Sequence, residues 1–532
     1  MSRLALTDMD LSRSLGDMRK QAAELCRTGD WEAALVLHEV LRQENPDSFA
    51  SALPHARLLR EIGRSRQAIE RLEPVAARDP DPQRSLSLIA AWRKELNIHS
   101  GQDLAAVTPE NPTSGPLPGQ AASVPPPNRQ GTLVREGRLD EVVALRAEHM
   151  LANPGRVKAR LVWIEGLIMA GRFEEAERAV TDLSGILDLH PEAAVQRAWR
   201  EARHDRYDAA RRIVRTALDE RGHRALHWPV SRIDWLKTAR HPSSSNLALF
   251  TTVHNEKLRL PWFLRYYREL GIRHFVIVDN DSTDGSREWL MDQGDVSLYW
   301  TPDDFRSAMC GMRWINLLAE RHVPGGWCLY VDADEQLVYP DVEHRGLPDL
   351  VAWLEAQGHE AMRAHMIDMA ASPLADGALL APGQDPVERC PYFEPHYRFI
   401  PKSGAPYERV TGGLRDVLGE SRAMQALPMV KTPLVRIPSG VRFLSSSHDI
   451  LPARVADVTG GLLHFKLAGD YFERYFTKSR HAARPGEAAR AQRIKESLQA
   501  EGGLSLPLSA LRYRDSTQLV TLGILRPGGW AG

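Results

Sequence analysis

The architecture of the carboxy-terminal half of this chain follows from one segment, Trp327-Cys328-Leu329-Tyr330-Val331-Asp332-Ala333-Asp334-Glu335. An apolar run leads directly into two aspartates that one alanine separates, and such a run predicts a buried strand. The strand would present both carboxylates at its exposed carboxyl end. The same Asp-x-Asp pattern occurs at residues 8–10 and 79–81, but no strand precedes it there, so only Asp332 and Asp334 are predicted to form a site.

Short apolar runs alternate with helical patterns on the amino-terminal side of this segment. Strands are predicted at residues 247–253, 274–278, 296–300 and 327–331, and helices at residues 261–270, 286–291 and 308–321. This alternation is typical of βαβ units and predicts a parallel sheet. We therefore expect an open α/β domain that starts near Asn246.

Polar residues follow three of the predicted strands where the strands end. They are His254-Asn255-Glu256, Asp279-Asn280-Asp281-Ser282-Thr283-Asp284-Gly285 and Asp332-Ala333-Asp334-Glu335. In open α/β sheets ligands bind beyond the carboxyl ends of the strands, so we expect these groups to line one site. Carboxylate oxygens suit Mg²⁺ or Mn²⁺. The alternative for Asp332 and Asp334 is a solvated acidic turn.

Three segments resemble successive motifs of family-2-like glycosyltransferases with the GT-A fold: HNE at 254–256, VDNDSTDGS at 278–286 and YVDADE at 330–335. The resemblance covers about residues 247–476. It implies a Rossmann-like nucleotide-diphospho-sugar transferase domain and an inverting transfer, in which an acceptor hydroxyl attacks the anomeric carbon as the nucleoside diphosphate leaves. It also implies that Asp334, and Asp332 directly or through water, hold Mn²⁺ or Mg²⁺, which would stabilise the leaving diphosphate.

The resemblance further implies where the nucleotide binds. Asp279 and Asp281 lie where family members bind the base and the ribose, and residues 254–256 would line the same wall. The alternative for residues 279–285 is a turn with a helix cap. That turn is the preferred interpretation for Asp284 and Gly285, whereas Asp279 at the strand end is the preferred ligand.

Further candidates lie beyond residue 360, in segments whose order is similar to that in the family. Asp368, on a predicted strand, is the candidate general base that takes the acceptor's proton, and a structural salt bridge is the alternative. His464, in an apolar strand, is preferred to His448 as a third metal ligand. A histidine in such a strand is more often a core residue, which is the alternative here.

Two cations, Arg415 after two glycines and Lys431 before a proline, are candidates for binding phosphate oxygens. Arg would bind by a bidentate fork and Lys as a point charge, and ordinary surface charge is the alternative for both. Residues 471–481 mix aromatic and basic side chains at helical spacing. They could contact a lipid interface that carries a lipid-linked acceptor, or pack on the domain with a solvated basic face.

The amino-terminal part contains a sequence repeat of 34 residues. Its matching positions are Leu25, Gly29, Ala34 and Pro46, then Leu59, Gly63, Ala68 and Pro80, and later Gly137, Gly171 and Asp205. The pattern resembles the tetratricopeptide repeat, in which Gly opens the turn between two helices, a small Ala lets the helices pack closely and Pro ends the second helix. We predict all-α tetratricopeptide-like helical repeats with five helical hairpins, which would position an acceptor or bind a protein partner.

A chain of 532 residues is long enough for two to four domains at roughly 100–200 residues each. We predict helical repeats at residues 1–99 and 132–241, joined by a flexible Pro-, Gly- and Ser-rich linker at 100–131. The α/β GT-A domain is expected at 246–476. Residues 477–532 are expected to form a helical or irregular extension.

Charge and cysteine content exclude several classes of protein. Lys and Arg (68) nearly balance Asp and Glu (69), so the net charge of −1 provides no field that would attract nucleic acid. Four cysteines without a CxxC pair argue against a disulfide framework and favour a reducing, cytoplasmic location. The amino terminus does not resemble a signal peptide. No stretch has the ~20 apolar residues of a membrane span, so any membrane contact is expected to be peripheral, at the inner face.

Three functions compete for this sequence. The leading hypothesis is a glycosyltransferase that moves a sugar from a nucleotide-sugar donor to a glycan, lipid-linked or protein acceptor. The alternative is a tetratricopeptide scaffold whose α/β domain binds a nucleotide or a glycan without turnover. A metal-dependent nucleotidyltransferase is disfavoured, because the loop at residues 254–257 lacks the glycines of a phosphate-binding loop.

Overall fold

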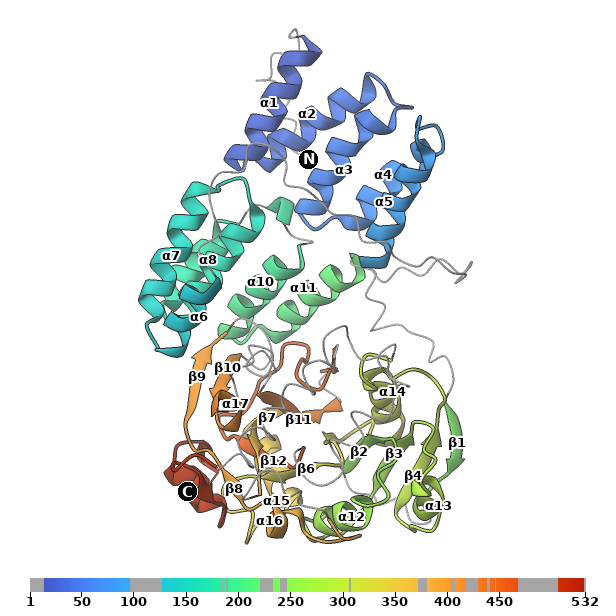
Figure 1. The fold of residues 1–532 in the computed structure, drawn as a ribbon, viewed down its shortest axis with the longest axis vertical. Coiled ribbons are helices and arrows are strands. Elements are labelled where there is room, and N and C mark those ends of the chain that lie inside the picture. Colours follow the sequence, from blue (N-terminus) through green and yellow to red (C-terminus); the bar gives the residue numbers. More distant parts are fainter. Residues whose placement is uncertain are drawn as a thin grey trace. The chain divides into compact units, whose positions relative to one another are not determined.

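The computed structural model divides into two compact units, one formed mainly by residues 1–226 and the other mainly by residues 227–532 (Figure 1). The structure describes residues 14–95, 127–183, 185–187, 190–220, 233–239, 246–305, 308–371, 380–402, 407–417, 429–437, 441–444, 446–466 and 506–530. Most of the predicted linker and all of residues 471–481 therefore lie outside the described residues. Among the described helices, none is long and apolar enough to cross a membrane.

The first unit consists of helices that pair along the chain. They are α1 (Leu15–Thr28), α2 (Trp31–Gln43), α3 (Phe49–Glu61), α4 (Ser65–Ala76), α5 (Pro82–Glu95), α6 (Pro127–Arg135), α7 (Leu139–Ala152), α8 (Val157–Met169), α9 (Phe173–Thr181), the short 3₁₀ helix η1 (Gly185–Leu187), α10 (Pro191–Arg203) and α11 (Tyr207–Glu220). Helix α6 begins inside the predicted linker. Its first residue is a proline, which favours a helix start, and it buries Leu133 and Val134.

The turns within five of these pairs are built alike. Each has a residue with φ between 58° and 87° at the turn, and these residues are Gly29, Gly63, Gly137, Gly171 and Asp205. In each turn the amide of the next residue donates to the carbonyl five residues back, at 2.8–3.0 Å. This is the closure of a helix end that favours glycine, and Asp is one of the few other residues that tolerate it. The five predicted hairpins are confirmed, and α5 is an additional helix.

The residue five positions after each turn residue is an alanine in four of the pairs and a valine in the fifth. Every one of them is fully buried: Ala34, Ala68, Val142, Ala176 and Ala210. The two predicted groups of repeats also share one core, because Trp31 packs with Val157 and Leu161. The indole of Trp31 donates to the carbonyl of Gly155 at 3.3 Å. These two groups therefore form one helical unit of the tetratricopeptide type.

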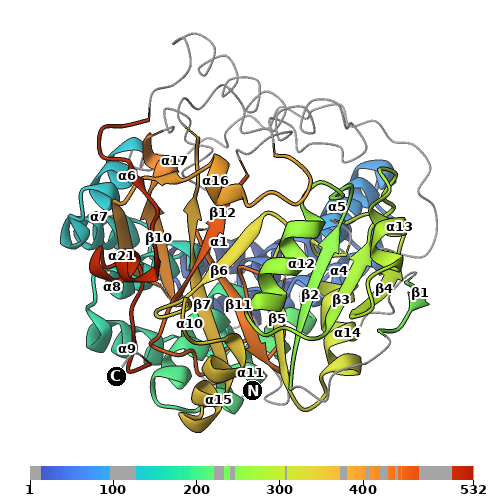
Figure 2. The same cartoon turned by 90° about the horizontal axis from the view of Figure 1, so that it is seen from below.

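The second unit is organised around a nine-stranded mixed sheet with the order β1-β4-β3-β2-β5-β11-β7-β12-β6 (Figure 2). Its strands are β1 (Asp234–Lys237), β2 (Leu247–Val253), β3 (Phe275–Asp279), β4 (Val296–Trp300), β5 (Trp327–Tyr330), β6 (Glu335–Val338), β7 (Ala361–Asp368), β11 (Val430–Arg436) and β12 (Gly460–His464). Strands β4, β3, β2 and β5 are mutually parallel, as predicted. Strands β7 and β12 run in the same direction as these four, whereas β1, β11 and β6 run in the opposite direction, so the sheet is mixed rather than parallel.

Consecutive strand residues point to opposite sides of the sheet, and here both sets include buried apolar side chains. Helices therefore cover both faces. Leu249, Ile277 and Leu329 join a core with α12 (Leu260–Glu269) and α15 (Leu347–Ala356). Phe250, Val278 and Tyr330 join another core with α14 (Met312–His322). A further helix, α13 (Ser286–Met291), matches the prediction. Helix α14 begins four residues later than predicted, after Met309 and Cys310, which have positive φ.

Smaller elements complete the unit. They are α16 (Pro386–Arg389), β8 (Tyr392–Phe393), β9 (Tyr397–Pro401), β10 (Glu408–Gly412), α17 (Leu414–Val417), β13 (Leu511–Arg512) and α21 (Ser516–Thr521). Strand β13 pairs with β8. Trp530 is 1% exposed, and its indole donates to the carbonyl of Pro340 at 2.7 Å.

The α/β unit extends beyond both of its predicted boundaries. Strand β1 pairs with β4 twelve residues before Asn246, at Asp234. At the other end, residues 507–530, which were predicted as a separate extension, supply Leu519 and Ile524 to one core and Trp530 to another. Both additions complete the sheet domain rather than form parts of their own.

Candidate metal and nucleotide site

The sheet topology brings the predicted motifs to one edge. Strand β2 pairs in parallel with β3 and with β5, so the segments after these three strands leave the sheet at the same edge. Strand β12 is parallel to β7, and in this register His464 lies beside Asp368. Strand β6 runs antiparallel to β12 and places Glu335 on the other side of His464. Strand β11 is antiparallel to β5 and β7, so Lys431 near its start also lies at this edge.

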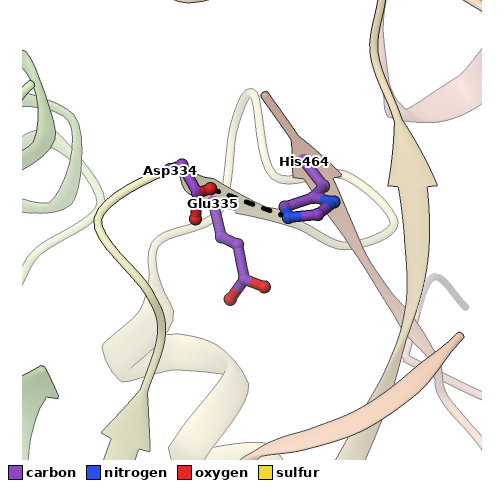
Figure 3. A group of neighbouring side chains, drawn as sticks. All are labelled: Asp334, Glu335 and His464. Carbon is purple, nitrogen blue, oxygen red and sulfur yellow. Dashed lines mark ion pairs between the residues drawn. The ribbon is translucent and has the colours of Figure 1, made fainter. Parts of the chain in front are cut away.

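Three side chains at this edge have the spacing of a metal site. Ligand atoms of Asp334, Glu335 and His464 all lie within 4.8 Å of one another (Figure 3). The Asp334 carboxylate is 29% exposed, and its Oδ2 lies 3.7 Å from Nε2 of His464. A carboxylate and an imidazole held in this way can both contact a small divalent ion.

The orientation of His464 is fixed from its other side. Its Nδ1 lies 2.6 Å from Oδ1 of Asp368, so the Nδ1 proton is donated to that carboxylate. In the neutral imidazole this leaves the lone pair on Nε2, the nitrogen that faces Asp334. A carboxylate that orients a histidine in this way is a common second layer of metal sites. The residues present therefore fit a divalent ion.

Asp368 itself is held by a second partner. The Nε of Arg415, in α17, donates to its Oδ2, and Nη2 donates to Oδ1 at 3.1 Å. Burial acts to raise the pKa of Asp368, but the charge of Arg415 and the hydrogen bond from His464 outweigh it and hold the pKa well below its usual range. A carboxylate so strongly stabilised as an anion is a weak base. This makes Asp368 unsuited to the predicted role of general base. Its buried ion pair with Arg415 matches the alternative, a structural salt bridge.

Lys431 is paired with the same motif that was predicted to bind metal. Its Nζ donates to Oδ2 of Asp332 and, at 2.6 Å, to Oε1 of Glu335. Burial acts to lower the pKa of Lys431, but these two carboxylates raise it. Burial raises the pKa of Glu335 to about 7, against the attraction of Lys431. Ordinary surface charge was the alternative to phosphate binding for Lys431 and Arg415. It does not apply, because their side chains are only 4% and 6% exposed.

His448, the second histidine considered, lies outside the group of ligand atoms. Its Nδ1 donates to the carbonyl of Val430 at 2.7 Å, next to Lys431. Burial lowers the pKa of His448 to about 4, and the charge of Lys431 contributes. The preference for His464 over His448 is consistent with this arrangement.

The segments after β2 and β3 form a second, connected polar group. Asp279 is fully buried, and its Oδ2 accepts from Nε of Arg287 at 2.6 Å. Nη2 of Arg287 also lies 3.8 Å from Oδ1 of Asp281, which is 43% exposed. The guanidinium of Arg287 lies 5.4 Å from the centre of the Trp300 ring. Of the two aspartates, Asp281 is the one exposed to a ligand, whereas Asp279 anchors the arginine.

The predicted residues after β2 hold the loop after β3. Oδ1 of Asn255 accepts from the amides of Thr283 (2.7 Å) and Asp284 (3.1 Å). His254 donates through Nδ1 to the carbonyl of Asn280 at 2.7 Å. The Glu256 carboxylate accepts from Arg259 at 3.0 Å. These contacts give residues 254–256 a structural role, because Asn255 and His254 hold the loop after β3 in place.

The turn interpretation of residues 284–285 agrees with the geometry. Oδ1 of Asp284 accepts from the amide of Ser286 at 2.9 Å, at the start of α13. Gly285 has φ 87°, a conformation that favours glycine. Helix α13 thus starts after Gly285, and the side chain of Asp284 accepts from its first amide.

A small pocket adjoins the metal-site residues. Its apolar lining residues are Leu258, Trp262, Ala333, Leu380, Pro386 and Phe465, and its polar ones are Arg259, Asp334 and Gln384. An apolar wall next to Asp334 is a suitable surface for the carbon face of a substrate.

Glu335 was expected in the polar group at this edge but was given no role of its own, and Arg287 was not among the predicted site residues. Arg287 lies eight residues after its partner Asp279, in the first turn of a predicted helix. Only the general tendency of a buried carboxylate to have a cationic partner could have suggested Arg287.

Comparisons with known proteins add little to this geometry. No protein-family model and no curated protein matches the chain. Among solved structures, MamA MSR-1 C2 is 18% identical over 39% of this chain and 98% of its own, with a TM-score of 0.15. The TPR domain of P58(IPK) is 13% identical over 40% of this chain and 55% of its own, with a TM-score of 0.16. A mutant O-GlcNAc transferase of Thermobaculum terrenum is 13% identical over 58% and 44%, with a TM-score of 0.14. Scores this low carry no argument about function.

Proposed function

We propose that this chain is a glycosyltransferase that transfers a sugar from a nucleotide-diphosphate donor to a hydroxyl of a glycan, lipid-linked or protein acceptor, with inversion and with Mn²⁺ or Mg²⁺ as cofactor. The observation that carries the proposal is the position of Asp334 and the Nε2 of His464, 3.7 Å apart at the carboxyl-end edge of a sheet. Ligands of α/β sheets bind at that edge. The GT-A assignment of the domain is part of this proposal.

Each part of the site has a role in the proposed reaction. Asp334 and His464 hold the ion, which when bound would neutralise charge on the leaving diphosphate. Asp368 orients His464 and is itself held by Arg415. Asp281, after β3, and Arg287, in α13, would contact the base and the ribose. The pocket beside Asp334 would receive the acceptor.

The transfer itself breaks one bond and forms another. The acceptor oxygen bonds to the anomeric carbon, the bond from that carbon to the diphosphate oxygen breaks, and the acceptor proton passes to a base. Because Arg415 and His464 keep Asp368 anionic and weakly basic, we assign it to positioning. This revises the role predicted from the resemblance.

The helical unit supports an additional function, the binding of a protein. Five hairpins with buried small residues form a tetratricopeptide-type array, and such arrays present extended surfaces to partners. We propose that this unit recruits the acceptor or a partner protein. The scaffold alternative shares this surface and differs only in lacking turnover.

Calorimetric titration with a panel of nucleotide sugars tests whether the chain binds the donor and the ion that the proposal requires, and release of nucleoside diphosphate then separates the enzyme from the scaffold alternative. We expect one donor to bind more tightly when Mn²⁺ is present, and the Asp334→Ala variant to lose this dependence. The Asp341→Ala variant, which changes a carboxylate outside the site, is the control and should bind as the wild type does. If no nucleotide sugar binds with or without Mn²⁺, the enzyme proposal is wrong.

A further inference from the structure

A buried lysine, Lys431, forms ion pairs with two of the three carboxylates in the motif Asp332-Ala333-Asp334-Glu335. The side chain of Lys431 is 4% exposed, and its Nζ contacts both Asp332 and Glu335. Lys431 belongs to β11, 99 and 96 residues away from these partners along the chain. An ammonium so deeply buried needs compensating charge, and two carboxylates supply it.

The oxygens of these two carboxylates are all engaged within the protein. For Asp332, Oδ1 accepts from the hydroxyl of Tyr330 at 3.0 Å and Oδ2 accepts from Lys431. For Glu335, Oε1 accepts from Lys431 at 2.6 Å and Oε2 accepts from the amide of Asp332 at 3.0 Å. A divalent ion bound to either carboxylate would lie close to the ammonium of Lys431, and the two positive charges would repel each other.

Asp334 and His464 are in a different situation. Nε2 of His464 faces the Asp334 carboxylate, while its Nδ1 is committed to Asp368. Exposure does not separate the two aspartates, since the Asp332 side chain is 41% exposed and that of Asp334 is 29% exposed. What separates them is that the ammonium of Lys431 contacts Asp332 and Glu335. The motif therefore separates into one carboxylate that faces a ligand and two that face Lys431.

We propose that Lys431 is a built-in cation that keeps Asp332 and Glu335 out of the metal's ligand set. The divalent ion then binds through Asp334 and His464 alone and keeps its other coordination positions for water and for the donor's diphosphate. The inference rests on the proposed function, because it concerns the same metal site. It replaces the predicted role of Asp332 as a ligand and gives Lys431 a role other than binding phosphate.

The charge count explains why such a lysine would be useful. Three carboxylates at one site would bind a divalent ion tightly, and metal affinity rises with the number of charged ligands. Lys431 compensates one of the three negative charges of Asp332, Asp334 and Glu335, and it contacts two of these carboxylates, Asp332 and Glu335. The resulting site binds the ion weakly enough that the diphosphate contributes to its retention, so ion and donor bind together.

This inference is tested by titrating the full chain with Mn²⁺ alone and measuring the affinity by calorimetry. Lys431→Met removes the charge at similar length, and we expect the affinity for Mn²⁺ to rise at least tenfold because Asp332 and Glu335 become ligands. Lys431→Arg keeps the charge and should give no gain. Adding both Asp332→Asn and Glu335→Gln to Lys431→Met should abolish the gain.

A second pair of variants leaves the lysine in place, so the test does not depend on the folding of Lys431→Met. Asp334→Asn should weaken Mn²⁺ binding at least tenfold, whereas Asp332→Asn should change it less than threefold. Equal losses in the two variants would overturn the inference. So would a Lys431→Met variant that folds, as judged by circular dichroism, and binds Mn²⁺ no more tightly than the wild type does. Both results leave the proposed function standing if the wild type binds Mn²⁺, whereas absence of binding in every variant would overturn both.

Discussion

The contact between Asp368 and His464 gives the most discriminating prediction about the site. In Asp368→Asn, the amide oxygen can still accept the Nδ1 proton of His464, but the negative charge is lost. Removing the acidic partner of a histidine ligand typically costs about 10- to 100-fold in metal affinity. This loss corresponds to roughly 1.4–2.7 kcal/mol of binding free energy.

The same substitution also affects folding, because Arg415 loses its partner. The Arg415 side chain is 6% exposed and makes two hydrogen bonds to Asp368. Removing one partner of a buried ion pair costs about 3–5 kcal/mol. We therefore expect Asp368→Asn to lower the free energy of unfolding by about this amount, measured by chemical denaturation without metal.

A matched control separates the two effects. Glu408, in β10, is another buried carboxylate with a histidine and arginines as partners: His365 at 3.0 Å, Arg526 at 3.2 Å and Arg363 at 3.4 Å. Its partners are not candidate metal ligands. Glu408→Gln should therefore lower stability to a similar extent and leave the Mn²⁺ affinity unchanged. If both variants lose metal affinity equally, or if Asp368→Asn keeps wild-type affinity, Asp368 does not orient a metal ligand.

Further predictions concern pH, a repeat turn and the carboxy-terminal segment. Burial acts to raise the pKa of Glu408, but the hydrogen bond from His365 and the charge of Arg363 lower it to about 2 from 4.5. This group therefore contributes stability above pH 4.5 that is lost as the pH falls towards 2, roughly 3 kcal/mol in all, and Glu408→Gln should remove that part of the pH dependence of unfolding. Gly171→Ala, at φ 73° with open space around a new Cβ, should cost about 1 kcal/mol of unfolding free energy; Gly185→Ala, which has open space and no positive φ, should cost nothing measurable. Trp530→Ala should destabilise the α/β unit by about 3–5 kcal/mol, whereas Leu508→Ala, fully exposed in the same segment, should not; equal denaturation midpoints would show that residues 507–530 are dispensable for the core.

The central part of the fold was predictable because its strands carry their own pattern. Residues 247–253 and 296–300 are mainly apolar runs whose side chains are buried on both faces of the sheet, and their bounds match β2 and β4. The 34-residue spacing of the turn residues likewise determines five hairpins, because each position requires the left-handed conformation. Local chemistry was sufficient in both cases.

The added strands were not predictable because pairing, not pattern, defines them. Strand β1 has the sequence Asp-Trp-Leu-Lys and becomes a strand through its antiparallel partner β4. Residues 507–530 have little periodicity of their own, yet Trp530 and Leu519 complete the cores of a domain whose other parts lie far away in the sequence. Such contacts depend on the tertiary structure.

The sequence indicated which residues gather at the candidate site, but it did not indicate which of them form ion pairs with one another. Asp334 and His464 were both expected at a metal, and the structure places them 3.7 Å apart. The partners of Asp332 and Asp368 are Lys431 and Arg415, which are 99 and 47 residues away from them. The sequence alone could not tell whether these two cations bind phosphate or carboxylates, since both are anions with similar geometry.

Release of nucleoside diphosphate from nucleotide sugars tests the central claim most directly. The full chain is incubated with a panel of donors, with Mn²⁺ or with a chelator, and the free diphosphate is quantified for the wild type, Asp334→Ala and Asp341→Ala. We predict release from at least one donor by the wild type and by Asp341→Ala, loss of release with the chelator, and loss of release in Asp334→Ala. Equal release by Asp334→Ala and the wild type would contradict the assignment of the metal site.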